Sequence, residues 1–182
     1  ERVRLVLDEC FVQFLTSGEE ASMQLETGRF RYLFVLQAFT KIYAVPGIRL
    51  GYGISSDKAL LERMETVRQP WSVSTPAQAA GLSALKEDHR EEQTRQLVKS
   101  ERERMEKELE NLRIEYIPSE ANFLLFNSEI NWFEELKKRG ILIRDCANYR
   151  GLGNGWYRLA VRLPEENDRL LECMKQVLNE RS

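Results

Sequence analysis

The sequence predicts an α/β protein, because short apolar runs alternate with longer stretches of helical spacing. Residues 3–7 and 32–36 are apolar runs of strand length, and residues 86–113 place apolar side chains at helical spacing among many charges. The alternation continues to the end of the chain. We expect three parts: a first α/β part at 1–85, a connecting helix at 86–113, and a small α/β domain at 114–182.

In the first part we expect strands at 3–7, 32–36 and 48–54. A loop with a single lysine and a Pro46-Gly47 turn separates the second strand from the third. Ser56-Asp57 is a cap for a helix that continues to about residue 68. Thr75-Pro76-Ala77-Gln78 is a capping box with proline at the first helical position, so a second helix should begin there.

Strand and helix patterns also alternate in the last part of the chain. The expected strands cover 114–117, 122–126, 141–143 and 156–161, and the expected helices cover 131–139 and 165–178. Gly151, Gly153 and Gly155 resemble a phosphate-binding loop, but a strand follows them rather than a helix. We therefore expect a hairpin-like turn at these glycines.

Composition excludes several classes of function. The formal net charge is −2 with mixed signs, so neither nucleic acid nor an anionic membrane is an expected partner. No apolar run approaches the roughly 20 residues that span a bilayer. Three unclustered cysteines, Cys10, Cys146 and Cys173, suggest neither a disulfide framework nor a metal site. A reducing, cytoplasmic setting is expected.

Lys41 is the residue most suggestive of chemistry. It lies between two expected core strands, where partial desolvation favours a neutral, nucleophilic amine. Arg49 follows eight residues later. The alternative interpretation is a lysine that extends from a strand end into solvent.

The residues around Lys41 resemble a known family. Ala38-Phe-Thr-Lys41 followed by Ala44-Val-Pro-Gly-Ile-Arg49-Leu-Gly51 is similar to the cofactor-lysine signature of the class I/II, fold-type I enzymes that use pyridoxal phosphate (PLP). The resemblance implies that Lys41 binds PLP covalently and that Arg49 binds its phosphate. The family usually has Ser or Thr at the position of Ala38.

Asp8 directly follows the strand at 3–7. It therefore lies at the carboxyl end of a strand, which is where α/β sheets bind ligands. By the resemblance, Asp8 pairs with the pyridine nitrogen of PLP; the alternative is a strand-end turn former. Many relatives have a tyrosine at the position of Phe11. Asp8-Glu-Cys-Phe11-Val-Gln-Phe is more similar to the threonine-phosphate decarboxylase branch of the family than to histidinol-phosphate aminotransferases.

A pair of arginines near the end of the chain suggests an anionic ligand. Arg158 lies in the strand pattern at 156–161, and Arg162 directly follows it. Arg158 and Arg162 would lie on one strand face, where like charges are costly without an anion or acidic partners. By the resemblance, Arg158 binds the substrate carboxylate, and Arg162 and Arg144 complete the substrate site. The alternative for Arg162 is a surface pair with Glu165 or Glu166.

The resemblance covers nearly the whole chain and implies the end of the PLP-binding large domain followed by a complete small domain. We therefore expect a C-terminal fragment of a homodimeric enzyme. The implied reaction is decarboxylation of L-threonine O-3-phosphate to aminopropanol phosphate in cobalamin biosynthesis. Two alternatives stay open: a histidinol-phosphate-type aminotransferase, and a non-catalytic piece that binds no cofactor.

Overall fold

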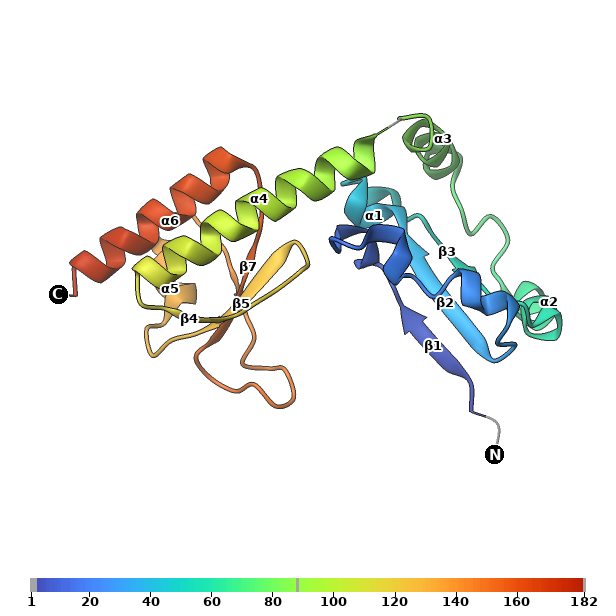
Figure 1. The fold of residues 1–182 in the computed structure, drawn as a ribbon, viewed down its shortest axis with the longest axis horizontal. Coiled ribbons are helices and arrows are strands. Elements are labelled where there is room, and N and C mark those ends of the chain that lie inside the picture. Colours follow the sequence, from blue (N-terminus) through green and yellow to red (C-terminus); the bar gives the residue numbers. More distant parts are fainter. Residues whose placement is uncertain (1–2, 88, 182) are drawn as a thin grey trace. The chain divides into compact units, whose positions relative to one another are not determined.

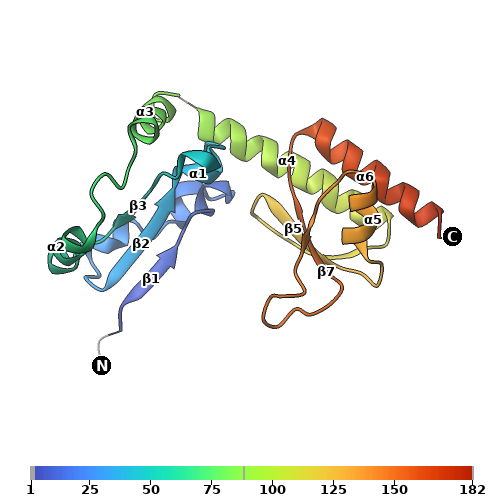
Figure 2. The same cartoon turned by 180° about the vertical axis from the view of Figure 1, so that it is seen from behind.

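Helices and strands follow one another in mixed α/β order along the chain, as the sequence predicts (Figures 1 and 2). The structure is a computed structural model and describes residues 3–87 and 89–181. The chain divides into two units, Glu1–Arg95 and Gln96–Ser182. Within the described residues, no helix has both the length and the apolar character needed to cross a membrane.

Unit 1 contains a three-stranded sheet with the strand order β1-β2-β3. Its strands are β1 (Leu5–Asp8), β2 (Leu33–Ala38) and β3 (Gly51–Ile54). Its helices are α1 (Phe39–Ile42), α2 (Lys58–Val67) and α3 (Thr75–Ala84), with 3-10 turns at Val12–Phe14, Gly18–Ala21, Leu25–Gly28 and Pro46–Ile48.

Strand β2 forms the centre of the unit 1 sheet, and its first three side chains are apolar on both faces. Leu33, Phe34 and Val35 are all buried, which is typical of a central strand. β1 pairs with β2 in parallel, and β3 pairs with β2 antiparallel. The C-terminal end of β1, the C-terminal end of β2 and the start of β3 therefore lie at one edge of the sheet.

Two local predictions in unit 1 need correction. The third strand begins at Gly51 rather than at residue 48, because Pro46–Ile48 forms a 3-10 turn and Arg49 has a left-handed backbone with φ 57°. The cap of α3 is Ser74 rather than Thr75, since the Ser74 side chain accepts a hydrogen bond from the backbone N–H of Ala77. The cap of α2 by Asp57 is confirmed.

Unit 2 contains a four-stranded antiparallel sheet with the order β4-β5-β7-β6. Its strands are β4 (Glu115–Ile117), β5 (Phe123–Asn127), β6 (Arg144–Asp145) and β7 (Trp156–Ala160). Its helices are α5 (Trp132–Lys138), α6 (Pro164–Asn179) and most of α4 (Arg90–Asn111).

One face of the unit 2 sheet is buried. The alternating side chains Leu124 and Phe126 of β5 pair with Leu159 and Tyr157 of β7, and all four are buried. The helices contribute the buried side chains Met105, Leu109, Trp132, Leu136, Met174 and Val177. The intervening strand residues, among them Arg158, face the opposite side of this sheet.

The predicted strand at 141–143 is wrong. Gly140, with φ 74°, ends α5, and the backbone N–H of Ile141 still donates to the carbonyl of Leu136. The strand β6 therefore starts only at Arg144. The hairpin-like turn before β7 is confirmed, because β6 and β7 are antiparallel. Gly155 is required there, since a Cβ atom would lie 2.8 Å from the backbone oxygen of Ser128.

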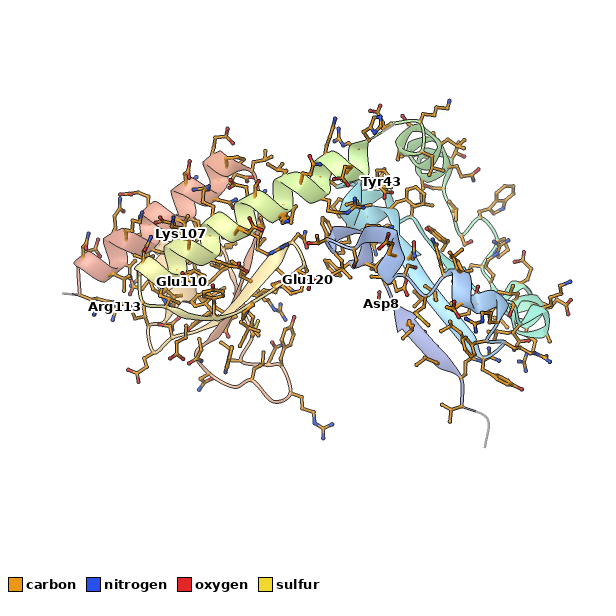
Figure 3. All side chains as sticks on the ribbon, in the orientation of Figure 1. Asp8, Tyr43, Lys107, Glu110, Arg113 and Glu120 are labelled. Atoms are coloured by element: carbon orange, nitrogen blue, oxygen red, sulfur yellow. The ribbon has the colours of Figure 1, made fainter. Side chains whose placement is uncertain are left out.

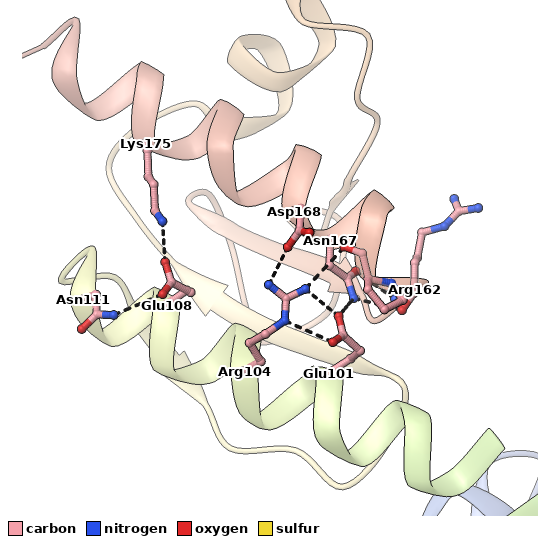
Figure 4. Close-up of polar contacts among 9 residues, drawn as sticks. Glu101, Arg104, Glu108, Asn111, Arg162, Asn167, Asp168 and Lys175 are labelled. Carbon is pink, nitrogen blue, oxygen red and sulfur yellow. Dashed lines mark hydrogen bonds and ion pairs between the residues drawn. The ribbon is translucent and has the colours of Figure 1, made fainter. Parts of the chain in front are cut away.

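Helices α4 and α6 run side by side and share a polar network (Figure 4). Asn167, which is 1% exposed, donates to Glu101 Oε2 at 2.7 Å and to the carbonyl of Arg162 at 2.9 Å, and accepts from the Arg162 N–H at 3.0 Å. Arg104 forms an ion pair with the same Glu101 oxygen at 2.7 Å. These bonds satisfy a buried carboxylate and connect the start of α6 to α4.

We expect Asn167→Ala to lower the free energy of unfolding of unit 2 by about 2–4 kcal/mol, because it leaves buried polar groups without partners. The neighbouring Asp168 is the matched control. Its side chain is 65% exposed, so Asp168→Ala should cost less than about 1 kcal/mol. Hydrogen exchange at the buried amides of β5 measures both changes. Equal losses for the two variants would contradict the central role of Asn167.

Candidate active site

Asp8 is the last residue of β1 and lies at the sheet edge described above (Figure 3). The backbone N–H of Cys10 donates to Asp8 Oδ1 at 3.1 Å. The pKa of Asp8 is lowered most by a hydrogen bond from the Cys10 thiol and next by the hydrogen bond from the Cys10 N–H. The positive charge of Lys41 makes a smaller contribution in the same direction. Burial and the same hydrogen bond raise the pKa of Cys10 to about 11. Asp8 is therefore an ionised, solvent-facing carboxylate at neutral pH.

Lys41 lies on the short helix α1, directly after β2. Its Nζ atom is 5.3 Å from the centroid of the Phe11 ring, and its charge acts on both Asp8 and Cys10. The structure thus brings Lys41 and Asp8 together. The predicted loop position between two strands is wrong, as is the predicted desolvation, because α1 places Lys41 at an exposed position beyond the sheet edge.

Arg49 belongs to the same edge, since β3 begins two residues later and pairs Gly51 with Ala38. The Arg49 guanidinium is exposed and donates to the carbonyl of Pro46 at 2.8 Å. Asp8, Lys41 and Arg49 therefore come from the end of β1, the residues after β2 and the residues before β3. A carboxylate, an amine and a guanidinium thus extend from one edge of the sheet, where α/β sheets place ligands.

The arginines predicted to bind substrate all lie in unit 2, and two of them are paired. Arg144 of β6 and Arg158 of β7 are direct partners in the antiparallel ladder, so their side chains lie on the same face of the sheet. The Arg158 guanidinium is 5.1 Å from the centroid of the Phe123 ring, and that of Arg144 is 5.5 Å from the centroid of the Tyr149 ring. Both arginines act electrostatically on Cys146, whose pKa is raised by burial. Two like charges at directly opposite positions favour an anion between them.

Arg162 does not share this strand. β7 ends at Ala160, so the prediction that Arg158 and Arg162 lie on one strand face is wrong. Arg162 instead forms an ion pair with Glu166 at 2.8 Å. This is the surface pair that the sequence left open. Arg144, not Arg162, is the arginine beside Arg158.

A polar network around the buried residues Glu9 and Gln37, behind the edge of unit 1, was not predicted from the sequence. Gln37 of β2 donates to Glu9 Oε2 and to Ser22 Oγ, both at 3.2 Å, and accepts from the Tyr52 hydroxyl at 2.7 Å. Glu9 also accepts from Ser22 Oγ at 2.6 Å and from the backbone N–H of Met23 at 2.8 Å. A usable signal was present in the sequence, since Gln37 interrupts an apolar strand and Glu9 directly follows another.

Comparison with known proteins identifies the family. The model of the aminotransferase class I and II family matches residues 1–173. The chain belongs to this family. It is 37% identical over 180 residues to threonine-phosphate decarboxylase of Salmonella typhimurium, covering 97% of this chain and 49% of that protein. It is also 37% identical over 175 residues to histidinol-phosphate aminotransferase 1 of Archaeoglobus fulgidus, covering 96% of this chain and 52% of that protein.

The fold agrees with that of a solved family member. The crystal structure of histidinol-phosphate aminotransferase from Clostridium acetobutylicum matches with a TM-score of 0.92 and 31% identity, over 97% of this chain and 55% of that one. The chain spans about half the length of the curated relatives it matches. The predicted α/β class and the predicted family are therefore confirmed.

Members of this family depend on pyridoxal phosphate. The residues at the edge of unit 1 fit this group chemically. The ionised carboxylate of Asp8 suits a protonated ring nitrogen, and Lys41 offers an exposed primary amine to an aldehyde. The exposed guanidinium of Arg49 suits a phosphate.

We expect Cys10→Ala to raise the pKa of Asp8, because the variant removes the thiol hydrogen bond that stabilises the carboxylate. Cys10→Ser keeps a donor at this position and is the matched control. NMR titration of the Asp8 carboxyl group measures both shifts. A pKa that stays the same in Cys10→Ala would show that the thiol does not stabilise this carboxylate.

Proposed function

We propose that this chain forms part of a PLP-dependent enzyme that decarboxylates L-threonine O-3-phosphate. The observation that carries the proposal is the direct pairing of Arg144 with Arg158, which concentrates two guanidinium groups on one sheet face. A substrate with both a carboxylate and a phosphate needs two cationic anchors, and arginine suits either group. The similarity to threonine-phosphate decarboxylases over 97% and 98% of this chain supports the same choice.

Within the proposal, three residues of unit 1 would hold the cofactor. Lys41 would bind it through the side-chain amine, Asp8 would accept a hydrogen bond from the ring nitrogen, and Arg49 would bind the phosphate. When bound, pyridoxal phosphate supplies an electron sink for cleavage of a bond at the substrate Cα atom. The charge of Asp8 would keep the ring nitrogen protonated, because an adjacent anion favours the charged form.

The arginines of unit 2 would orient the substrate. Arg158 binds the carboxylate, and Arg144 binds the phosphate beside it, so that the substrate bridges the two like charges. Arg162 contributes to the phosphate site only if Glu166 releases it. Anchoring decides which Cα bond is broken, and therefore decides between loss of CO2 and loss of a proton. In the proposed reaction the substrate loses its carboxylate as CO2 and takes up a proton at Cα, which yields aminopropanol phosphate.

The second candidate is a histidinol-phosphate-type aminotransferase, favoured by the similarity to the Clostridium acetobutylicum and Archaeoglobus fulgidus proteins. Phe11 favours the decarboxylase. By the resemblance, the threonine-phosphate decarboxylase branch of the family has phenylalanine at this position, where histidinol-phosphate aminotransferases have tyrosine. A role in cobalamin biosynthesis, a cytoplasmic location and a homodimer belong to the same proposal. The alternative from another class is a non-catalytic polypeptide that binds no cofactor.

We expect an enzyme that carries this sequence at the full length of its relatives to release CO2 from L-threonine O-3-phosphate when loaded with pyridoxal phosphate and given no keto acid. Lys41→Ala should abolish this release, since it removes the amine that holds the cofactor. Trapping of labelled CO2 measures the reaction. Amino transfer from histidinol phosphate to a keto acid, without CO2 release from threonine phosphate, would favour the second candidate instead.

In the same enzyme, Arg158→Gln and Arg144→Gln should each raise KM for L-threonine O-3-phosphate about 10- to 100-fold, because each loses charge-assisted hydrogen bonds to the substrate. Arg150→Gln is the control, because Arg150 is an exposed arginine in the turn between β6 and β7. Steady-state kinetics separate KM from kcat. An equal effect of Arg150→Gln would contradict a specific role for the paired arginines.

A further inference from the structure

The network around Gln37 connects all three strands of the unit 1 sheet. Gln37 and Tyr52 are direct partners in the ladder between β2 and β3, and the Tyr52 hydroxyl donates to Gln37 Oε1 at 2.7 Å. From the other side, Gln37 Nε2 donates to Glu9, the residue that follows β1. One amide therefore links β1, β2 and β3 through side chains as well as through backbone hydrogen bonds.

Three members of this network, Glu9, Gln37 and Tyr52, each lie close in sequence to a proposed cofactor-binding residue. Glu9 directly follows Asp8 and is buried where Asp8 is exposed. Gln37 lies four residues before Lys41. Tyr52 lies three residues after Arg49. The three side chains that are proposed to hold the cofactor thus extend from backbone segments that the network ties together.

The geometry of the network is strongly specified. Gln37 is 5% exposed and Glu9 is 9% exposed, so unpaired polar atoms on either residue would be costly. Both donors and the acceptor of the Gln37 amide are used, which determines the orientation of the amide. The carboxylate of Glu9 accepts from Ser22 and Met23 as well. Movement of one strand relative to the others would break several of these bonds at once.

We propose that Glu9, Gln37 and Tyr52 are positioning residues, which hold the segments of Asp8, Lys41 and Arg49 in one arrangement at the sheet edge. This inference rests on the proposed function, because it takes Lys41 as the residue that binds the cofactor. Precise placement matters for such a site, since misplacement of a reacting group by about 1 Å is costly. A purely structural network would stabilise the sheet without changing the reactivity of Lys41.

Two substitutions break the network by different amounts. Tyr52→Phe removes only the hydroxyl and should fold normally, because the ring keeps its contacts with Phe39. Gln37→Met removes all the hydrogen bonds that pass through the Gln37 amide. The control is Gln13→Leu. Gln13 lines a cavity of about 150 Å³ together with Gln37 and Tyr52, but its Nε2 donates to Gln37 Oε1 only at the long distance of 3.5 Å, and its buried Oε1 atom has no hydrogen-bond partner among the described residues.

The first measurement uses the 182-residue chain without cofactor. Hydrogen exchange is followed at the backbone N–H of Glu9, which donates to Leu36, and of Phe39, which donates to Leu50. We expect about fivefold faster exchange in Tyr52→Phe and a larger increase in Gln37→Met, with no change in Gln13→Leu. The amide of Leu61 in α2 should exchange at the same rate in every variant. Unchanged exchange at Glu9 and Phe39 would overturn the proposal.

The second measurement reports on Lys41 itself. The same substitutions are made in an enzyme that carries this sequence at the full length of its relatives. Each enzyme is mixed with pyridoxal phosphate, reduced with borohydride, and mapped by mass spectrometry, and the label on Lys41 is divided by the label on the exposed Lys58. We expect this ratio to fall about fivefold in Tyr52→Phe and not in Gln13→Leu. Faster exchange with an unchanged ratio would overturn the positioning role. A wild-type full-length enzyme that shows no preference for Lys41 over Lys58 would instead overturn the proposed function, on which the inference depends.

Discussion

The parallel pairing of β1 with β2 is the constraint on which the candidate active site depends. Parallel strands end at the same edge of a sheet, so Asp8 at the end of β1 and Lys41 just beyond β2 are brought together although 33 residues separate them. The antiparallel return of β3 then brings Arg49 to the same edge. None of these side chains needs to be buried for this placement, because the backbone ladder brings their segments to one edge.

In unit 2, the register of an antiparallel sheet determines where the charged side chains lie. Its sheet is antiparallel, and helices cover one face, so alternate residues of β7 face the core or the opposite side. Register then decides which side chains are neighbours. Arg158 is paired with Arg144 of β6 rather than with Arg162, which lies beyond the strand and binds Glu166. A shift of one residue in register would move Arg158 to the buried face.

Local signals in the sequence predicted most elements well. Amphipathic spacing predicted α4 and α6, and Asp57 was correctly predicted to cap α2, because caps and apolar periodicity depend on a few neighbouring residues. Element ends were predicted less well. The strand predicted at 141–143 is wrong, because the backbone N–H of Ile141 still donates a hydrogen bond to the carbonyl of Leu136 in α5. The sequence around Gly140 contains no signal for how far such a turn extends.

The sequence by itself determined the family and the chemical types at the site, since the spacing of Lys41 and Arg49 and the position of Asp8 depend on residue identity alone. Only the tertiary structure decided the exposure of Lys41, the pairing of Arg144 with Arg158, and the link from Glu9 through Gln37 to Tyr52. The physical reason is that burial and strand register arise from contacts between segments far apart in the chain, and no local pattern specifies them.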